Sequence, residues 1–467
     1  MRPMRAAAAT MIAIAALLAG WQRGAAAHAL AQRYDLPLPL GYFLLAAGAA
    51  VAATFIILVL TARRPELPGS RISHGRVFAR GIVPSAAVVA LQTVSIALLF
   101  LIVSAGFLGH QNPFKNLAPV AVWVIWWVGL ALVSAFIANV WALLNPFAAV
   151  FDFAQWLAER RGGSLSLRRP YPAWLGAWPA CALFLLFMWL ELVAPGRDVP
   201  RNIAIAMLIY LALNFTGCVA FGRDVWLRSG DVFAIVFELF GRFAPLHFRR
   251  DHVWHWTLRP FASGLHARAP LDASMIGFAL LALGSVTIDG VMETPVWASI
   301  VETIFAASGR EPAEGPVYML LATALLIAGP LCLAALYVAA IGIIKRIAGG
   351  PRLTALAGAF VLSLVPIAIA YHLAHYFSLL AIAGQFIIPL ASDPFGHGWD
   401  LFGTMLYRVD IGVVDARFVW YLSVVAIVTG HIIAVWLAHI AALRIYKDPA
   451  MARRSQYPML LLMVGYT

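Results

Sequence analysis

The sequence carries little charge for its length. Only 12% of its 467 residues are Asp, Glu, Lys or Arg, whereas 63% are hydrophobic, and a water-soluble domain carries about twice that charged fraction. Long polar segments are also absent, so no separate soluble domain can form. The composition therefore excludes a soluble protein and predicts an integral membrane protein.

Cysteine is scarce as well. Cys181, Cys218 and Cys332 lie in apolar segments and are not paired by spacing, which excludes a disulfide framework or a cysteine zinc site. We interpret them as small buried hydrophobic residues. The sequence also lacks a P-loop, a dinucleotide-binding fingerprint, a Gly-x-Ser-x-Gly elbow and a His-Glu-x-x-His motif.

The hydrophobic residues form runs long enough for membrane helices of about 20 residues, without the alternation of an outer-membrane barrel. We therefore predict an all-α, polytopic helical bundle in a single domain, 28–467, with about nine transmembrane helices. The expected spans are 40–61, 83–108, 119–144, 174–194, 203–222, 273–291, 317–343, 353–391 and 418–443. The eighth is long enough to continue as a re-entrant or interfacial piece. The apolar end of the chain, 457–467, is too short to cross; it is either a surface segment or the start of a further span.

Residues 1–27 have the pattern of a secretory signal peptide. Arg2 and Arg5 precede an apolar run, and the run of alanines at 25–27 offers a small-residue cleavage site. Cleavage there makes His28 the mature N-terminus, whereas cleavage two residues later removes it. The alternative is an uncleaved first helix, because the apolar run is near the upper length for a signal.

Arginine and lysine are unevenly shared between the loops. One set of alternate loops carries most of them, and the other set holds only Arg33, Lys115, Arg197, Arg201, Arg310, Arg408 and Arg417. The positive-inside rule places the mature N-terminus outside the membrane and the C-terminus in the cytoplasm. The net charge of +12 follows mostly from this bias, with some attraction to anionic lipid, so no nucleic acid is needed as a partner.

The longest basic loop, 223–272, contains two features. The stretch 231–242 is too short to span and predicts an interfacial amphipathic helix. The residues His247, Asp251, His252 and His255 have plausible metal-ligand spacing. Neighbouring tryptophans and arginines favour an interfacial anchor instead.

Ionisable residues inside the predicted spans indicate a site, because such groups are costly at membrane depth. Asp289 lies in the sixth span, and His372 and His375 lie in the eighth within Tyr-His-Leu-Ala-His-Tyr. At about 1.5 Å per helical residue, all three come near the outer end of the bundle. Asp289 and Glu293 are four residues apart and the two histidines three apart, so each pair shares a helix face.

These residues support two chemistries. Two imidazoles and a carboxylate can bind a divalent metal such as zinc, with Glu293 and His28 as further candidate ligands, and the metal would activate water. Without a metal, His372 or His375 is a candidate base with Asp289 as its orienter. The alternative is a set of interior residues that only hydrogen-bond the helices together.

Other polar residues receive weaker interpretations. His431 is a third nitrogen ligand if it packs beside His372, although a helix–helix hydrogen bond is favoured. Glu191, Asn139 and Asn214 have the same ambiguity, and we assign them no chemistry. The turn-rich segment 392–400 is expected to cap a cavity on the outer side, near Asp35 and His28.

The chain resembles the bacterial membrane proteins identified as fenitrothion hydrolases. The resemblance lies in His-Ala-Leu-Ala-Gln-Arg-Tyr-Asp-Leu-Pro-Leu-Pro from His28, in Thr-Ile-Asp-Gly-Val at 287–291 and in His-Leu-Ala-His-Tyr at 372–376, and it covers nearly the whole chain. It implies hydrolysis of the phosphorus to aryl-oxygen bond of a lipophilic organophosphorus triester. Such neutral small molecules partition into the lipid bilayer. In this chain the best candidates for catalysis are Asp289, His372 and His375.

Two other functions fit the same residues. A permease or metal-handling transport protein would use the histidines as a transient binding site. An assembly factor would need them only for structure. Turnover, flux or neither would distinguish the three.

Overall fold

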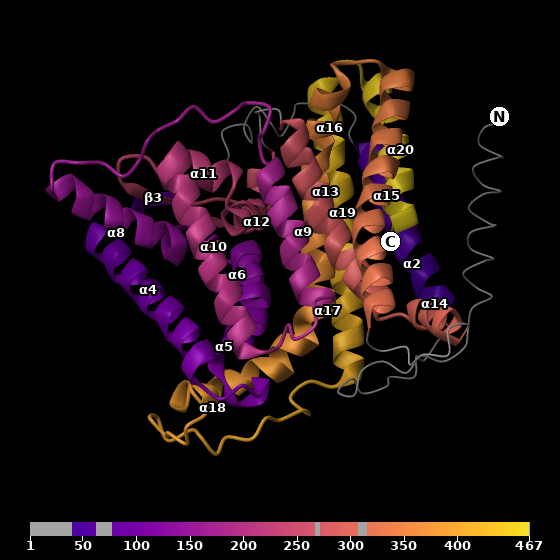
Figure 1. Cartoon of the computed structure of the whole chain (residues 1–467). Coiled ribbons are helices and arrows are strands. Elements are labelled where there is room, and N and C mark those ends of the chain that lie inside the picture. The colour runs from indigo at the N-terminus through magenta and orange to yellow at the C-terminus, as the bar shows by residue number, and fades with distance from the viewer. Residues whose placement is uncertain (1–39, 62–76, 267–270, 307–314, 467) are drawn as a thin grey trace.

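The computed structural model describes residues 40–61, 77–266, 271–306 and 315–466. Within these ranges the chain is mostly helical, with one small sheet (Figure 1). The predicted all-α helical bundle is confirmed. The predicted signal peptide and cleavage site lie outside the described residues, as do His28 and Asp35.

Eight helical segments among the described residues are long and apolar enough to cross a membrane, and the chain is therefore a multi-pass membrane protein. These segments are α2 (Leu40–Thr61), α4 (Ser85–Leu108), α5–η2–α6 (Leu117–Phe136), α10 (Pro200–Phe221), α13 (Ala273–Met292), α15 (Pro316–Ala348), α16–α18 (Leu353–Ser392) and α19 (Ala416–Ile445). They match eight of the nine predicted spans.

The remaining predicted span, 174–194, forms a shorter helix, α9 (Trp178–Leu192). Its 15 residues cover about 22 Å, less than the roughly 30 Å of a hydrocarbon core. The helix starts late because Pro179 stands in its first turn, and Gly176, at φ +44°, directs the chain into it. In Figure 1, α9 lies beside α13 and runs antiparallel to α10.

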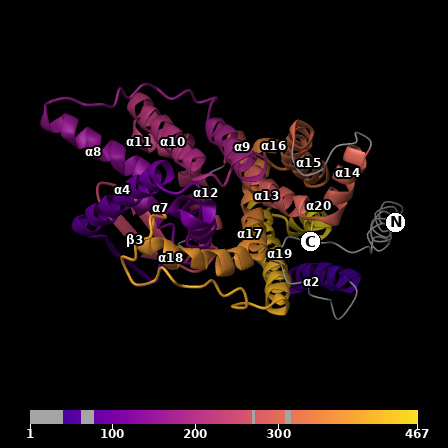
Figure 2. The ribbon, with the colours of Figure 1, turned by 60° about the horizontal axis from the view of Figure 1, so that its bottom comes forward.

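The loops and short elements gather at two ends of the bundle (Figure 1). The basic end carries the arginines of α8 (Pro146–Arg160) and α11 (Arg223–Ser229), together with the sheet. The loop end carries η1 (Pro113–Lys115), α18 (Ile387–Ser392) and the segment 393–415, which come forward in Figure 2.

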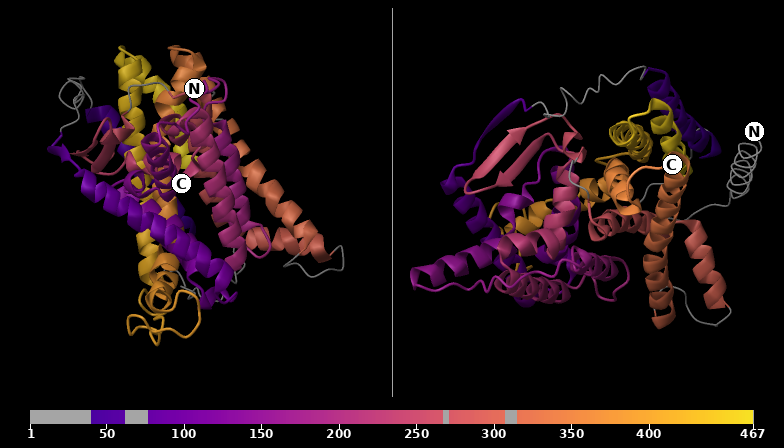
Figure 3. Two further views of the ribbon diagram at one scale, coloured as in Figure 1. Left: turned by 60° about the vertical axis from the view of Figure 1, so that its left-hand side comes forward. Right: turned by 90° about the horizontal axis from the view of Figure 1, so that it is seen from above.

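The sheet lies at one side of the basic end (Figure 3). Its strands are antiparallel in the order β1 (Ala79–Ile82), β3 (Trp254–Leu258) and β2 (Leu246–Arg250). The histidine-rich stretch of the basic loop thus forms a hairpin, in which Asp251 pairs with Arg249 at 2.6 Å. Among the described residues, no three His, Cys, Asp or Glu side chains gather to hold a metal ion. The alternative metal role of this stretch is therefore not supported.

The stretch predicted to be an interfacial helix is instead buried. It forms α12 (Val232–Gly241), which packs against η2 (Val120–Gly129), α6 (Leu130–Phe136), α7 (Trp141–Leu144), α9 and α17. An interfacial helix needs a strongly polar face, whereas Glu238 is the one charged residue of α12. Asp231 caps the helix by accepting hydrogen bonds from the N–H groups of Phe233 and Ala234.

The eighth span is one continuous passage with two short 3₁₀ breaks. It consists of α16 (Leu353–Val361), η4 (Leu362–Leu364), α17 (Val365–Ala383), η5 (Gly384–Phe386) and α18. The first break precedes Pro366, which has no N–H group to donate to the helical ladder. The helical segment continues through Gly384 and Pro389 to Ser392, and the re-entrant or interfacial character of this end stays a prediction.

Close helix contacts hold the bundle together around α13, α17 and α19. A Cβ atom on Gly430 of α19 would lie 2.6 Å from Cβ of Ala370, and one on Gly284 of α13 would lie 2.9 Å from Pro330 of α15. Small residues allow such approaches in membrane helices. The α17 helix packs against both α13 and α19.

The final described segment is α20 (Pro449–Tyr466), which packs against α15, α19 and α2. One face of its apolar second half packs on the bundle, where Met459 and Met463 are buried, and the other face is exposed at Leu461. The Tyr371 hydroxyl donates to the carbonyl of Tyr466 at 2.7 Å, and the hydroxyl groups of Thr287 and Tyr466 are in contact. The other described elements are α14 (Pro295–Ala306) and η3 (Ser263–Leu265).

Candidate functional site

The sixth and eighth predicted spans meet through α13 and α17, which pack side by side. Nε2 of His375 lies 2.9 Å from Oδ2 of Asp289, and the Tyr376 hydroxyl donates to the same carboxylate oxygen. The α13 helix continues past Gly290 to Met292. For that reason Glu293 also faces α17, with Oε2 3.8 Å from Nδ1 of His375.

The exposed fraction of these side chains decreases from the surface inward. The exposed fraction of the side chain is 48% for Glu293, 16% for His375 and 10% for Asp289, and Tyr376 is buried. Asp289 and Glu293 stand in the last turn of α13 and just beyond it, close to the loop end. The structure therefore brings Asp289, Glu293 and His375 together. The spacing predicted the shared face of Asp289 and Glu293, and the packing of α13 against α17 adds His375.

His372 does not share this contact. Its ring packs edge-on against Trp127 and Phe240, with centroids 5.7 and 5.8 Å away. The ring is 1% exposed, and neither nitrogen has a hydrogen-bond partner; the backbone of Val128 comes near without hydrogen-bond geometry. A buried imidazole without partners is a costly arrangement.

The predicted metal site therefore does not form among the described residues. Nε2 of His375 contacts Asp289, Nδ1 faces Glu293 from 3.8 Å, and His372 lies among aromatic rings instead of beside them. A separation of three residues places two side chains about 60° apart around a helix and about 4.5 Å apart along it. One histidine can then meet α13 while the other faces α12 and η2.

Two further residues join the site. Glu191, in the last turn of α9, lies within electrostatic reach of Asp289 and Tyr376, and its Oε2 is buried without a partner. The indole N–H of Trp127 is close to Glu191 and Tyr376 but makes a full hydrogen bond with neither. We define Glu191, Asp289, Glu293, His375 and Tyr376 as the Asp289 cluster.

The sequence held a signal for each of the added residues. Glu191 is the lone acidic residue of an apolar segment, and Tyr376 ends the Tyr-His-Leu-Ala-His-Tyr motif. Nothing in the sequence, however, shows that α9 packs against α13, and that contact brings the Glu191 carboxyl to Asp289.

An apolar cavity of about 890 Å³ lies on the opposite side of η2. It is bounded by α4, η2, α9, α10 and α12, and Trp126 is part of its wall. The next residue, Trp127, contacts His372. The η2 segment, a π-helix, thus contributes Trp126 to the cavity wall and Trp127 to the surroundings of His372.

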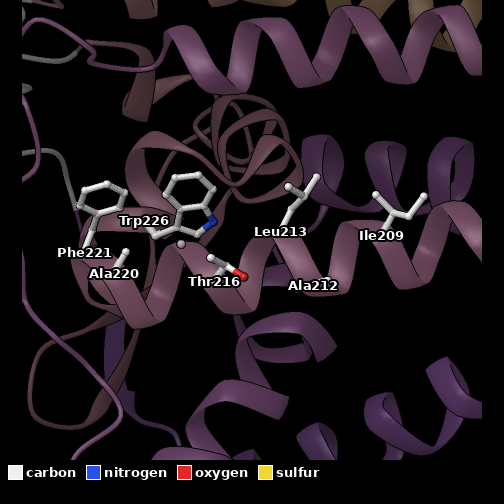
Figure 4. Close-up of a pocket in the computed structure, with 8 residues that line it drawn as sticks. Ile209, Ala212, Leu213, Thr216, Ala220, Phe221 and Trp226 are labelled. Carbon is white, nitrogen blue, oxygen red and sulfur yellow. The ribbon is translucent and has the colours of Figure 1, made fainter.

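A second, open groove of about 400 Å³ lies along α10 (Figure 4). Its lining comes from α10 together with Trp226 of α11. The indole N–H of Trp226 donates to Oδ1 of Asn214 at 3.0 Å. Because this groove is shallow, apolar and on the outside of a membrane helix, we interpret it as a lipid-facing surface.

His431 and His439 of α19, and Asp393 beyond α18, make local polar contacts. Nδ1 of His431 contacts the carbonyl of Ile427 in its own helix at 2.8 Å, and Nδ1 of His439 contacts Oε1 of Gln456 at 2.7 Å. The Asp393 carboxylate accepts from the N–H groups of His397 and Gly398 and so shapes the loop beyond α18.

No family model, curated protein or solved structure matches this chain. Similarity to a characterised protein therefore assigns no function to the Asp289 cluster.

Proposed function

We propose that this protein is a membrane-embedded hydrolase of lipophilic organophosphorus triesters, with His375 as the general base and Asp289 as its orienter. The observation that carries the proposal is the buried 2.9 Å contact between Nε2 of His375 and Oδ2 of Asp289. A carboxylate on one ring nitrogen fixes the tautomer of an imidazole and leaves the other nitrogen to take a proton. Tyr376 also holds the carboxylate, by donating to the same oxygen.

The free nitrogen in this arrangement is Nδ1, which faces Glu293 from beyond hydrogen-bond distance. Glu293 is half exposed, so its side chain swings toward solvent and a water molecule takes its place. The water gives a proton to Nδ1 of His375 while its oxygen attacks phosphorus. The bond from phosphorus to the aryl oxygen breaks, the phenolate leaves with the electron pair, and the proton passes to the products.

This chemistry needs few residues. A nitrophenolate is a good leaving group, so the site requires a base but no strong acid. No step of the proposal is placed on a metal, since no three His, Cys, Asp or Glu side chains of the described residues gather to hold one. The substrate is neutral and lipophilic and reaches the bundle from the bilayer. In the proposed orientation, the basic end faces the bacterial cytoplasm and the loop end faces outward.

Nitrophenol release from fenitrothion by the purified full chain in detergent tests this function. We expect Asp289→Asn and His375→Gln to lower the rate by about 100-fold or more, the range of a lost general base. His439→Gln is the matched control, since it removes a buried imidazole with one polar contact elsewhere in the bundle. Absence of turnover in the wild type, or normal turnover in both site variants, would overturn the proposal.

One observation favours a second candidate, a proton-coupled permease. Ionisable groups lead from the half-exposed Glu293 through His375 and Asp289 to the buried Glu191, and such chains carry protons in transporters. Proton flux in sealed vesicles distinguishes the candidates. Flux that is lost in Glu191→Gln, without any ester turnover, supports the permease.

A further inference from the structure

The open groove along α10 (Figure 4) and the large apolar cavity share part of their lining. Ile209 and Leu213 of α10 line both. From these residues the groove follows α10 to Phe221 and ends at Trp226. The Trp226 ring packs directly on the backbone of α10, because a Cβ atom on Gly217 would overlap it. The groove and the cavity therefore adjoin at Ile209 and Leu213.

The groove has about the length of one membrane leaflet. The helix from Ile209 to Phe221 is about 18 Å long, and half of the hydrocarbon core is about 15 Å thick. Phe221 is the last residue of α10, at the basic end. The groove thus runs from the basic-end surface to about the middle of the membrane, where the cavity begins. A lipid acyl chain of that leaflet covers the same depth.

Exposed apolar residues of α9 and α10 border the cavity. Leu186 of α9 is 50% exposed, and Ile205 and Ile209 of α10 are 41% and 56% exposed. The α9 helix packs against α12, α13 and α15, whereas α10 packs against α4, α5 and α8, so a hydrocarbon chain can enter between them. Because the lining is apolar, the cavity favours hydrocarbon over water. Its volume of about 890 Å³ is in the range of ligand sites.

Two arginines lie where the groove reaches the basic end. The backbone N–H of Arg169 donates to the carbonyl of the groove residue Ala220 at 2.9 Å, and Arg168 precedes it. The side chains of Arg168 and Arg169 are exposed, and neither forms an ion pair with another described residue, whereas Arg223 is paired with Asp152 at 2.8 Å. The groove therefore ends beside two positive charges that are not neutralised by a described carboxylate.

We propose that an anionic phospholipid of the basic-end leaflet binds along α10, with its phosphate at Arg168 and Arg169 and the end of one acyl chain in the large cavity. A guanidinium group suits a phosphate because its planar fork donates two parallel hydrogen bonds. Basic groups at the ends of membrane helices attract anionic lipid, and the apolar groove and cavity accept the chain. The site does not depend on hydrolysis or transport at the Asp289 cluster.

A photoactivatable lipid tests this site. The probe is phosphatidylglycerol that carries a diazirine at the end of one acyl chain, and phosphatidylcholine with the same chains is its matched analogue without net charge. The purified full chain in detergent is titrated with each probe, irradiated, and the labelled residues are mapped by mass spectrometry. We expect saturable labels on the cavity residues of α4, α9 and α10, with half-saturation at about a tenfold lower concentration of phosphatidylglycerol.

The variants separate the headgroup from the chain. Arg168→Gln combined with Arg169→Gln should reduce the preference for phosphatidylglycerol to below about twofold. The matched control is Arg453→Gln combined with Arg454→Gln, which removes the same charge from an exposed pair on α20 and should keep the preference. Ala206→Phe, which fills part of the cavity, should remove the chain-end labels. Tm, measured for each variant, shows whether it is folded.

Three results would overturn the proposal. Labels that do not saturate, or that spread over the other lipid-facing helices, would show exchanging bilayer lipid without a site. Equal labelling by the two probes, or a preference that falls as far in the α20 control, would exclude Arg168 and Arg169 as the headgroup site. Competition by palmitate or inorganic phosphate as strong as that by unlabelled phosphatidylglycerol would indicate a fatty-acid or simple anion site in place of a phospholipid site.

Discussion

Two buried aspartates organise two different regions of the bundle. Asp231 is fully buried, and its carboxylate accepts hydrogen bonds from Tyr210, Asn145 and the first N–H groups of α12. Asp289 accepts from Tyr376 and contacts His375, while nearby Glu191 and His372 keep unpartnered polar atoms. We call each aspartate with its polar neighbours a hub. The polar groups named at the Asp231 hub are paired, whereas some at the Asp289 hub have no partner.

The difference teaches which region is built for stability. A fully hydrogen-bonded polar network fixes a fold, and here it anchors α12 between the helices. Unpaired polar atoms cost stability, so a protein retains them where they serve another purpose. The Asp231 region is therefore the structural one, and the Asp289 region is where chemistry is expected.

The largest expected effect is on the structural hub. Asp231→Ala should lower the free energy of unfolding by roughly 3–5 kcal/mol, because Tyr210, Asn145 and the N-terminus of α12 lose their acceptor. Tryptophan fluorescence during heating in detergent measures the change. Asp231→Asn keeps one acceptor oxygen and should lose less. An unchanged Tm in Asp231→Ala would remove the contrast between the two aspartates.

Asp289→Asn should show the opposite balance. We expect the ester turnover of the proposed hydrolase to fall by about 100-fold, while Tm changes by only a few degrees, because the amide keeps an acceptor for Tyr376. Rate and Tm are measured on the same preparation. If Asp289→Asn destabilises the protein as strongly as Asp231→Ala does, Asp289 is a second structural hub.

Replacing His372 should stabilise the protein. In His372→Phe an apolar ring takes the place of an imidazole that has no partner among Trp127, Phe240 and Tyr376, and the gain should be about 1–2 kcal/mol. The matched variant His375→Phe should instead destabilise, since Asp289 loses a contact. A lower Tm for His372→Phe would show that the imidazole makes a stabilising contact.

The smallest expected effect is a loss of stability at low pH that comes from His266, which lies outside both aspartate hubs. Burial, helped by the positive charge of Arg444, lowers the pKa of His266 to about 4, compared with about 6.5 in an unfolded chain. Below pH 6.5 the unfolded state therefore binds more protons than the folded state, and stability falls as the pH drops toward 4. Because the ring is partly exposed, we expect a loss of only about 1 kcal/mol.

His266→Phe keeps the ring contact with Trp436 and removes the titration. Its Tm should fall less than that of the wild type between pH 7 and pH 5. Equal losses in both proteins would place the acid sensitivity elsewhere, including in the two aspartate hubs.

The spans could be predicted because hydrophobic length alone decides what crosses a bilayer. The depth of Asp289 and His375 followed from counting residues along their helices, and the contact at 2.9 Å agrees with that count. The rotation of each helix about its own axis could not be predicted in the same way. Depth places His372 beside Asp289, whereas rotation directs it to Trp127 and Phe240.

The burial of α12 was hidden for a related reason. A short apolar segment in a basic loop is typical of an interfacial helix. The phenylalanines of α12 instead pack against Trp126, Trp141 and Phe187, which come from three other segments of the chain. Contacts between distant segments of the chain decided both errors.

The π-helix η2 carries both Trp126 of the cavity wall and Trp127, which contacts His372. A π-helix closes its hydrogen bonds over five residues instead of four, so a return of η2 to α-helical bonding would expel one residue. Every side chain before that point would then turn by about 100° relative to those after it. Trp126 and Trp127 could not both keep their present neighbours, so the π-helical bonding of η2 allows one indole to contact Phe233 while the next contacts His372.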